Sequence, residues 1–230
     1  MNNEVRKSIL EAKIKLREIF SFIFLAFPVL GQSQHDSAFN NEVNAIIQKY
    51  DSIWDSSQET IVFTGSSSVR MWKNIQELFP EHQIINSGFG GSQTIDLLDF
   101  TNELILNYKP AKVFIYEGDN DISANKKSKE ILDAFATIVA QIKNQNSQTK
   151  IVLISPKPSI VRWHLKRKYK KLNRKLKRFC KRDENIEFAD VWNIMLDKKR
   201  LRTELFIEDG LHMNAQGYDL WYAILKNYLD

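Results

Sequence analysis

The chain has 230 residues, a formal net charge of +5, 43% hydrophobic residues and 11% aromatic residues. This length and composition suffice for one large globular domain with a full core, and they exclude an intrinsically disordered protein. The single cysteine, Cys180, excludes a disulfide framework and a thiolate metal site. The four histidines are not spaced as ligands of one metal ion, so a zinc enzyme is not expected.

The first 31 residues have the pattern of a targeting segment. Five basic residues between Arg6 and Arg17 precede the uncharged run IFSFIFLAFPVLG at 19–31. At 13 residues this run is shorter than the ~20 residues of a membrane-spanning helix. It fits the apolar region of a signal peptide, with Gly31 as a cleavage-site residue. We therefore predict a signal peptide at 1–31 and a secreted or periplasmic protein, with an uncleaved membrane anchor as the alternative.

After a lead-in helix expected at 32–57, short apolar runs alternate with segments of helical spacing. The runs typical of strands are 60–64, 82–87, 111–117, 150–155 and 185–190. The segments of helical spacing include Thr94–Tyr108, 162–182 and Ala215–Leu229, the last of which Asn214 is expected to cap. Strands that alternate with helices indicate βαβ crossovers. We therefore predict an α/β domain at 58–230 with a parallel sheet covered on both faces.

Four polar motifs stand beside these predicted strands and helices. GSSS at 65–68 follows the first strand, NSGFGGS at 86–92 the second and EGDND at 117–121 the third, and EDGLHMN at 208–214 precedes the last helix. Each motif alone is adequately explained as a turn. However, α/β sheets bind ligands at the carboxyl ends of their parallel strands, so we expect the motifs to meet at one edge.

Together the motifs supply the groups that acyl transfer needs. A serine of GSSS can serve as nucleophile if a base takes its proton, and His212 can be that base. Asp209, three residues earlier, can hold the imidazole in the required tautomer. The oxyanion that forms needs hydrogen-bond donors, which the backbone N–H of Gly91 and the amide of Asn120 can provide. These residues are therefore candidate catalytic groups.

The order G-x-S, a glycine loop, G-x-N-D and D-x-x-H before a C-terminal helix resembles the SGNH (GDSL-type) hydrolase family. The resemblance covers roughly residues 58–230. The four residues for which that family is named correspond to Ser67, Gly91, Asn120 and His212, and Asp209 corresponds to its acid. Alignment on Gly65 thus selects Ser67 among the serines.

This resemblance implies a flavodoxin-like, three-layer α/β/α sandwich with a five-stranded parallel sheet and no metal or cofactor. It also implies esterase, lipase or acetylhydrolase activity, closest to platelet-activating-factor acetylhydrolase-like and lysophospholipase-like bacterial esterases. The implied oxyanion donors are the N–H groups of Ser67 and Gly91 and the side chain of Asn120. Ser66 replaces the aspartate of the family's GDS motif, and we expect Ser66 and Ser68 to be turn and packing residues. We expect Asp121 to brace the loop.

Residues 162–182 form a second unusual segment, with 12 Lys and Arg and no acid, which leaves 21 basic and 28 acidic residues elsewhere. Its apolar residues recur at helical spacing, at Leu165, Tyr169, Leu172, Leu176 and Phe179. The segment is thus either a solvated surface helix or a site that attracts anionic lipid headgroups or an acidic polysaccharide. We do not expect a nucleic acid partner, because an exported enzyme seldom meets one.

These patterns predict a serine esterase that cleaves carboxylic esters through an acyl-enzyme on Ser67. We expect a short acyl group such as acetyl on a carbohydrate or lipid-like substrate, since the resemblance includes no lid domain. Acyl transfer to a sugar is an alternative, because it shares the acyl-enzyme intermediate. A non-catalytic protein that binds an anionic ligand on the same scaffold is another.

Overall fold

The computed structural model describes residues 27–229, with side chains described from residue 39 onward. The expected signal peptide lies almost entirely outside the described residues and stays a prediction. The chain divides into two compact units, Met1–Glu42 and Val43–Asp230. Helix α2, Phe27–Asp51, includes residues of both units, and it ends six residues before the end of the lead-in helix expected at 32–57. No helix in the described part of the chain is both long and apolar enough to cross a bilayer.

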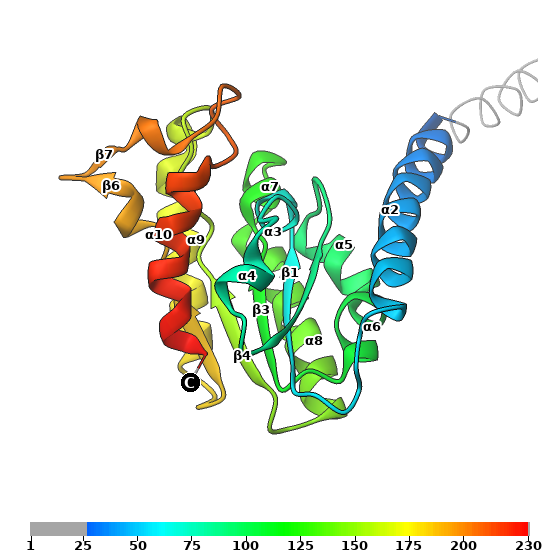
Figure 1. Ribbon diagram of the computed structural model, residues 1–230. Helices are drawn as coiled ribbons and strands as arrows, with labels where there is room; N and C mark the ends of the chain where they lie inside the picture. Colours follow the sequence, from blue (N-terminus) through cyan, green and yellow to red (C-terminus); the bar gives the residue numbers. More distant parts are fainter. Residues whose placement is uncertain (1–26, 230) are drawn as a thin grey trace, which may run out of the picture. The chain divides into compact units, whose positions relative to one another are not determined.

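The second unit is built on a five-stranded sheet in which every neighbouring pair is parallel (Figure 1). Its strands are β1 Thr60–Gly65, β2 Gln83–Gly88, β3 Lys112–Tyr116, β4 Lys150–Ile154 and β5 Ile186–Ala189. The strand order is β2-β1-β3-β4-β5, the flavodoxin-like order, which reverses direction between β1 and β3. The predicted fold class and all five predicted strands are confirmed.

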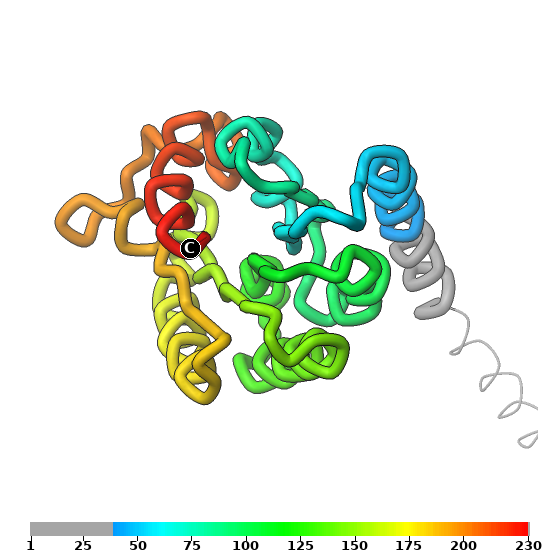
Figure 2. Tube along the Cα trace, turned by 60° about the horizontal axis from the view of Figure 1, so that its bottom comes forward, coloured from blue at the N-terminus to red at the C-terminus, as the bar shows by residue number. Residues whose placement is uncertain are grey.

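Helices cover both faces of this sheet (Figures 1 and 2). On one side lie α3, α4 and α10, and α8 and α9 lie on the other. The α-helices after α2 are α3 Ser67–Arg70, α4 Ile75–Leu78, α5 Thr94–Asp99, α6 Thr101–Leu104, α7 Asp119–Ser123, α8 Ser128–Gln145, α9 Lys166–Cys180 and α10 Ala215–Leu225. Short 3-10 turns are η1 Leu106–Tyr108, η2 Trp163–Leu165, η3 Asn193–Met195, η4 Thr203–Leu205 and η5 Lys226–Tyr228, and a small antiparallel hairpin joins β6 Leu196–Asp197 to β7 Arg200–Leu201.

Two predicted helices are shorter in the structure than the apolar spacing suggested. The segment Thr94–Tyr108 is divided into α5, α6 and η1, because Phe100 leaves helical geometry and the Thr101 hydroxyl donates to the backbone carbonyl oxygens of the preceding turn. The last helix is capped by Asn214, whose side chain accepts from the Gly217 N–H as expected. It tightens into η5 after Leu225.

Aromatic side chains fill the layer between the sheet and α10. The Phe63 and Phe114 rings stack with centroids 4.2 Å apart, and Trp72 meets Phe63 edge-on at 6.0 Å. Trp221 of α10 packs against Tyr116 at 4.9 Å. All five rings are at most 1% exposed, and burying each stabilises the fold by roughly 1.5–3 kcal/mol. The carboxyl ends of β1 and β3 are therefore held in place by closely packed aromatic side chains.

Candidate active site

The turn after β1 is fixed by a glycine that no other residue can replace. Gly65 has a φ of +118°, and a Cβ atom at this position would lie 2.0 Å from the Tyr116 carbonyl oxygen. The next residue, Ser66, donates its backbone N–H to that same oxygen at 3.0 Å. Helix α3 then begins at Ser67, and its residue Val69 is fully buried. The turn thus holds the Ser67 side chain at the carboxyl edge of the sheet.

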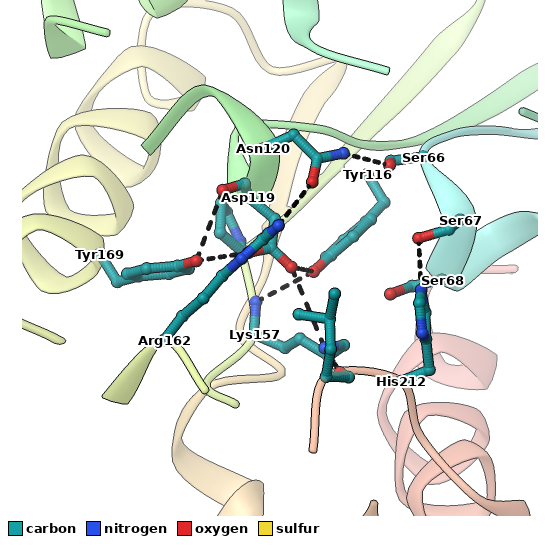
Figure 3. A network of polar contacts seen from close by, with 12 residues as sticks. Ser66, Ser67, Ser68, Tyr116, Asp119, Asn120, Lys157, Arg162, Tyr169 and His212 are labelled. Carbon is teal, nitrogen blue, oxygen red and sulfur yellow. Dashed lines mark hydrogen bonds and ion pairs between the residues drawn. The ribbon is translucent and has the colours of Figure 1, made fainter. Parts of the chain in front are cut away.

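Three candidate residues, from two distant parts of the chain, meet at this edge. The Ser67 Oγ lies 2.9 Å from His212 Nε2, and His212 Nδ1 lies 2.5 Å from Asp209 Oδ2 (Figure 3 shows Ser67 and His212). The other Asp209 oxygen accepts the backbone N–H groups of Leu211 and His212, at 2.8 and 2.9 Å. The structure therefore joins the candidate nucleophile, base and acid by consecutive hydrogen bonds.

The ionisation of Asp209 determines which ring nitrogen of His212 carries a proton. Burial acts to raise the pKa of Asp209, but hydrogen bonds from the His212 side chain and from the backbone N–H groups of His212 and Leu211 lower it to about 2. Asp209 is therefore ionised and can only accept a hydrogen bond. Nδ1 of His212 must then carry the ring proton, which leaves Nε2 as the acceptor for the Ser67 hydroxyl.

Two of the three predicted oxyanion donors are free. In the described part of the chain, neither the Ser67 N–H nor the Gly91 N–H is donated to another protein atom. Gly91 is exposed, has a φ of +78°, and has no heavy atom within 4 Å of the position of an added Cβ. Both backbone groups are therefore available to a bound ligand.

Asn120 differs from these donors because its side chain is already engaged (Figure 3). Its Nδ2 donates to Ser66 Oγ at 2.7 Å and to the Ser92 carbonyl oxygen at 2.8 Å, so both amide hydrogens are in use. Its Oδ1 accepts from Arg162 Nη2 at 3.0 Å. Ser66 is thus more than a turn residue, since it positions the Asn120 amide. Asn120 can donate to an oxyanion only by turning one hydrogen away from its present acceptor.

A buried ionic cluster stands behind Asn120 (Figure 3). The Asp119 carboxylate accepts from Tyr116 Oη at 3.0 Å, from Arg162 Nη1 at 2.7 Å and from the Tyr169 hydroxyl. The Lys157 Nζ lies 3.9 Å from the same carboxylate, and its side chain is 0% exposed. Burial opposes the ionisation of Asp119, but the charges of Lys157 and Arg162 hold its pKa below the usual range. The cluster therefore carries two cations and one anion.

The loop after β4 ties this cluster to the loop that carries His212. Lys157 Nζ donates to the Leu211 carbonyl oxygen at 2.6 Å. The backbone N–H groups of Ile160 and Val161 donate to the Gly210 carbonyl oxygen at 2.8 and 3.2 Å. Residues 157–162 thus connect the candidate base to Asn120.

A second buried carboxyl group supports the glycine loop. Glu117 is 0% exposed, and Ser92 Oγ lies 2.6 Å from its Oε1. Burial, followed by the charge of Asp121, raises the pKa of Glu117 well above its usual value. The hydrogen bonds agree: a protonated Glu117 can donate to Ser92, whose hydroxyl then donates to the Phe89 carbonyl oxygen at 3.3 Å.

Asp121, in α7, fixes the end of the glycine loop where α5 begins. Its two carboxylate oxygens accept from the Thr94 N–H at 3.2 and 3.1 Å. Burial raises the pKa of Asp121 to about 6. This bracing contact matches the role expected for Asp121.

Sequence reasoning missed Lys157, Arg162 and the carboxylate between them. Lys157 stands between two prolines in SPKPSIV, which has no other charged residue, and this was a signal for a buried lysine. Arg162 was counted with the basic run 162–182, although its side chain is only 15% exposed. Within the described residues, no three His, Cys, Asp or Glu side chains are grouped so that they could hold a metal ion.

The comparisons with known proteins agree with this geometry. The model of the GDSL-like Lipase/Acylhydrolase family matches residues 51–220. Among curated proteins, the N-acylneuraminate cytidylyltransferase of Escherichia coli O18:K1:H7 is 28% identical over 196 residues, covering 82% of this chain and 42% of that protein. The chain therefore spans less than half the length of that relative.

Several solved structures share the fold. A Streptococcus pneumonia protein named for platelet activating factor superposes with a TM-score of 0.74 and 24% identity, covering 88% of this chain and 99% of that one. A GDSL-like lipase from Bacteroides thetaiotaomicron has a TM-score of 0.67 and 22% identity, and the match covers 79% of this chain and 96% of that one. An acetylxylan esterase from Geobacillus stearothermophilus has a TM-score of 0.61 and 18% identity, and the match covers 72% of this chain and 91% of that one.

At these identities the structural matches establish the fold alone. The family model adds the sequence signature, and its match extends over most of the chain. The resemblance expected from the four motifs is therefore confirmed, and the chain belongs to the GDSL-like lipase/acylhydrolase family.

Proposed function

We propose that this protein is a serine esterase that removes short acyl groups such as acetyl from carbohydrate or lipid-like esters. The observation that carries the proposal is the hydrogen-bonded chain from Ser67 through His212 to Asp209, with distances of 2.9 and 2.5 Å. A serine, a base and an ionised acid in this order are the groups that activate a hydroxyl for attack on a carbonyl carbon.

The proposed reaction has two halves. In the first, Ser67 Oγ attacks the ester carbonyl carbon while its proton passes to His212 Nε2, and the protonated imidazole then gives that proton to the departing alcohol. In the second, water attacks the acyl-enzyme, its proton passes to Nε2, and the acid is released as the proton returns to Ser67 Oγ. Asp209 stays ionised and stabilises the imidazolium in both halves.

The developing oxyanion is assigned to the N–H groups of Ser67 and Gly91 and to Asn120. Because both Asn120 hydrogens have acceptors, the oxyanion has to compete with Ser66 Oγ or the Ser92 carbonyl oxygen for one of them. A negatively charged oxygen is the stronger acceptor, so the exchange favours the transition state over the neutral ester. Arg162 assists, because its donation to Asn120 Oδ1 polarises the amide.

Exposed apolar side chains beside the His212 loop support an acyl or other apolar group in the substrate. Ile160, Val161 and Ile207 are 42%, 50% and 41% exposed. Ile160 and Val161 bond to Gly210, and the Ile207 N–H donates to the His212 carbonyl oxygen at 3.0 Å. The names of two similar proteins, an acetylxylan esterase and an N-acylneuraminate cytidylyltransferase, favour a carbohydrate as the alcohol part.

Hydrolysis is favoured over acyl transfer to a sugar, although both use the same acyl-enzyme. The His212 side chain is 20% exposed and that of Asp209 42%. Water therefore has access to the base that must activate it.

The test of the proposal is Ser67→Ala, with Ser66→Ala and Ser68→Ala as matched controls within the same turn. We expect Ser67→Ala to lower kcat for p-nitrophenyl acetate by about 10⁴-fold or more and Ser68→Ala to keep most activity. Ser66→Ala should also keep most activity, because it removes only one acceptor of the Asn120 amide. A fluorophosphonate probe should label Ser67 alone, as read by peptide mass spectrometry. Activity that survives in Ser67→Ala, or labelling at Ser66, would refute the assignment.

A further inference from the structure

A groove with basic walls lies between α9 and the segment that follows β5. Its cavity volume is about 620 Å³, and its lining includes Phe188, which is half-buried, and Trp192, which is only 4% exposed. Exposed cations of α9 also line it, at Arg167, Lys170, Arg174 and Lys177. Because these cations are three or four residues apart, they share one face of the helix and form a stripe about 15 Å long.

The described part of the chain provides no counter-charge for this stripe. None of the four cations makes an ion pair with a described carboxylate. Asp190 also lines the groove, but its oxygens accept from the Trp192 N–H at 3.0 Å and from Asn193 Nδ2 at 2.6 Å. Asp190 is thus engaged within its own loop.

The stripe acts against the stability of the helix that carries it. Like charges three or four residues apart repel, and α9 has no acidic residue with which to offset them. Lys166, Arg167 and Lys168 also stand in its first turn, where the helix dipole disfavours cations. A bound polyanion would remove both penalties, so the arrangement suits a ligand better than it suits folding.

We propose that this groove binds an acidic polysaccharide, a linear glycan with a carboxylate on most of its sugars. Successive cations are about 4.5–6 Å apart along the helix axis, which is comparable with the length of one sugar unit. The half-buried Phe188 offers aromatic surface against which the apolar face of one sugar ring can pack.

Helix α9, which lines one side of the groove, begins near the candidate active site. Tyr169, one turn into α9, donates its hydroxyl to Asp119, the neighbour of Asn120. A glycan in the groove would therefore extend away from Ser67 along α9. We assign the esterified substrate to this same class of glycan; that part rests on the proposed esterase function. Glycans carry carboxylic esters on their hydroxyls, which a nucleic acid strand does not offer in its repeating unit.

The test compares two triple charge reversals in the full-length protein, equal in net charge, on α9 or, for Lys181, directly after its last residue. The groove variant carries Lys170→Glu, Arg174→Glu and Lys177→Glu. The control variant changes three exposed cations outside the groove lining, with Lys171→Glu, Arg178→Glu and Lys181→Glu. Both variants keep the basic residues near the N-terminus, so any binding by those residues is equal in the two. Circular dichroism would verify that both fold.

The probe is a fluorescent oligogalacturonate, and binding is read by anisotropy. We expect the groove variant to bind about 10- to 100-fold more weakly than wild type and the control to bind nearly as wild type. Wild-type binding should weaken between 0.1 and 1 M salt, as the screening length falls from ~10 to ~3 Å. Equal losses in both variants would mean attraction by net charge alone and overturn the groove. If oligo(dT) or phosphatidylserine vesicles bound more tightly than the oligogalacturonate, and binding was lost in the groove variant, the assignment of a glycan as the ligand would be wrong.

Hydrolysis separates this inference from the proposed function. Both variants should hydrolyse p-nitrophenyl acetate as wild type does, while kcat/KM for acetylated polygalacturonate should fall about tenfold in the groove variant alone. Equal kcat/KM for that polymer in wild type and groove variant would overturn the substrate assignment. Groove-dependent binding in a wild-type protein that hydrolyses no ester would uphold the binding site and refute the esterase.

Discussion

The carboxylates of Asp209 and Asp119 both have lowered pKa values, but for different reasons. The Asp209 side chain is 42% exposed, and hydrogen bonds within its own loop stabilise its charge. The Asp119 side chain is 7% exposed, and two cations from the loop after β4 stabilise its charge. An exposed carboxylate can lose its charge without leaving a buried partner, whereas a buried one cannot. Substitutions should therefore affect chemistry at Asp209 and stability at Asp119.

Asp209→Asn tests the contrast between Asp209 and Asp119, and we expect it to have the largest effect on activity among the variants in this comparison. An amide at this position can still accept the backbone N–H groups, but it no longer selects the tautomer in which Nε2 accepts from Ser67. We expect kcat for p-nitrophenyl acetate to fall about 10⁴-fold with little change in the unfolding midpoint. The exposed neighbour Glu208→Gln serves as the control. A large loss of stability in Asp209→Asn would show that this loop is structural.

Asp119→Asn should have the opposite signature. It leaves Lys157 and Arg162 without their anion, so we expect the free energy of unfolding to fall by about 3–5 kcal/mol in urea titrations. The folded pKa of Asp119 is lowered, so its stabilisation is present above the unfolded pKa and disappears as pH falls through the folded pKa. The gap between wild type and variant should therefore narrow below about pH 4.

The control for this prediction is Asp133→Asn, which breaks an exposed helical ion pair with Lys129 at 2.6 Å. Exposed pairs contribute little, so this variant should unfold nearly as wild type does. Equal stability of Asp119→Asn and Asp133→Asn would show that the buried cluster does not stabilise the fold.

Asn120→Ala tests how the two regions communicate. Losing one oxyanion donor typically costs about 10²–10³ in rate, and the loss should appear in kcat with KM almost unchanged. Ser66→Ala is the informative comparison, since it removes one Asn120 acceptor and leaves the amide in place. A raised KM with unchanged kcat in Asn120→Ala would make Asn120 a ground-state binder instead.

The sequence was sufficient for the parts of the molecule that depend on local patterns. Strand positions followed from apolar runs, and the Asp209–His212 pair lies within four residues, so its motif is visible without a structure. The positions of Ser67, Gly91 and Asn120 followed from a rule about parallel sheets and from the family resemblance. Their catalytic roles stay predictions.

The buried cluster could not be predicted, because its members are distant in sequence. Arg162 lies 43 residues after Asp119, and Tyr169 lies 50 residues after it. Which cations of a long basic run turn inward depends on how the loop after β4 crosses the sheet edge, and charge spacing does not encode that path. The division of Thr94–Tyr108 was missed for a related reason: apolar spacing continued through Phe100 while the backbone did not.

At pH 5 the smallest effect is expected for Glu117→Gln, whose pH dependence then distinguishes a buried protonated acid from a buried charge. Glu117 has a raised pKa in the folded protein, so the protonated form is favoured on folding, and wild-type stability should fall as pH rises from the unfolded pKa toward the folded one. Glutamine does not titrate and can still donate to Ser92 Oγ. Its added hydrogen lacks an acceptor, so we expect the variant to match or fall slightly below wild type at pH 5. Above pH 5, the stability of the variant relative to wild type should rise by up to about 1.4 kcal/mol per pH unit.

Asp121 titrates in both proteins, so its contribution largely cancels in the difference. Urea unfolding at four pH values between 5 and 8 measures the gap, and Glu81→Gln, at an exposed position, is the control. Parallel pH profiles for wild type and Glu117→Gln would mean that Glu117 is ionised in the folded protein, and that the glycine loop is held by a charge.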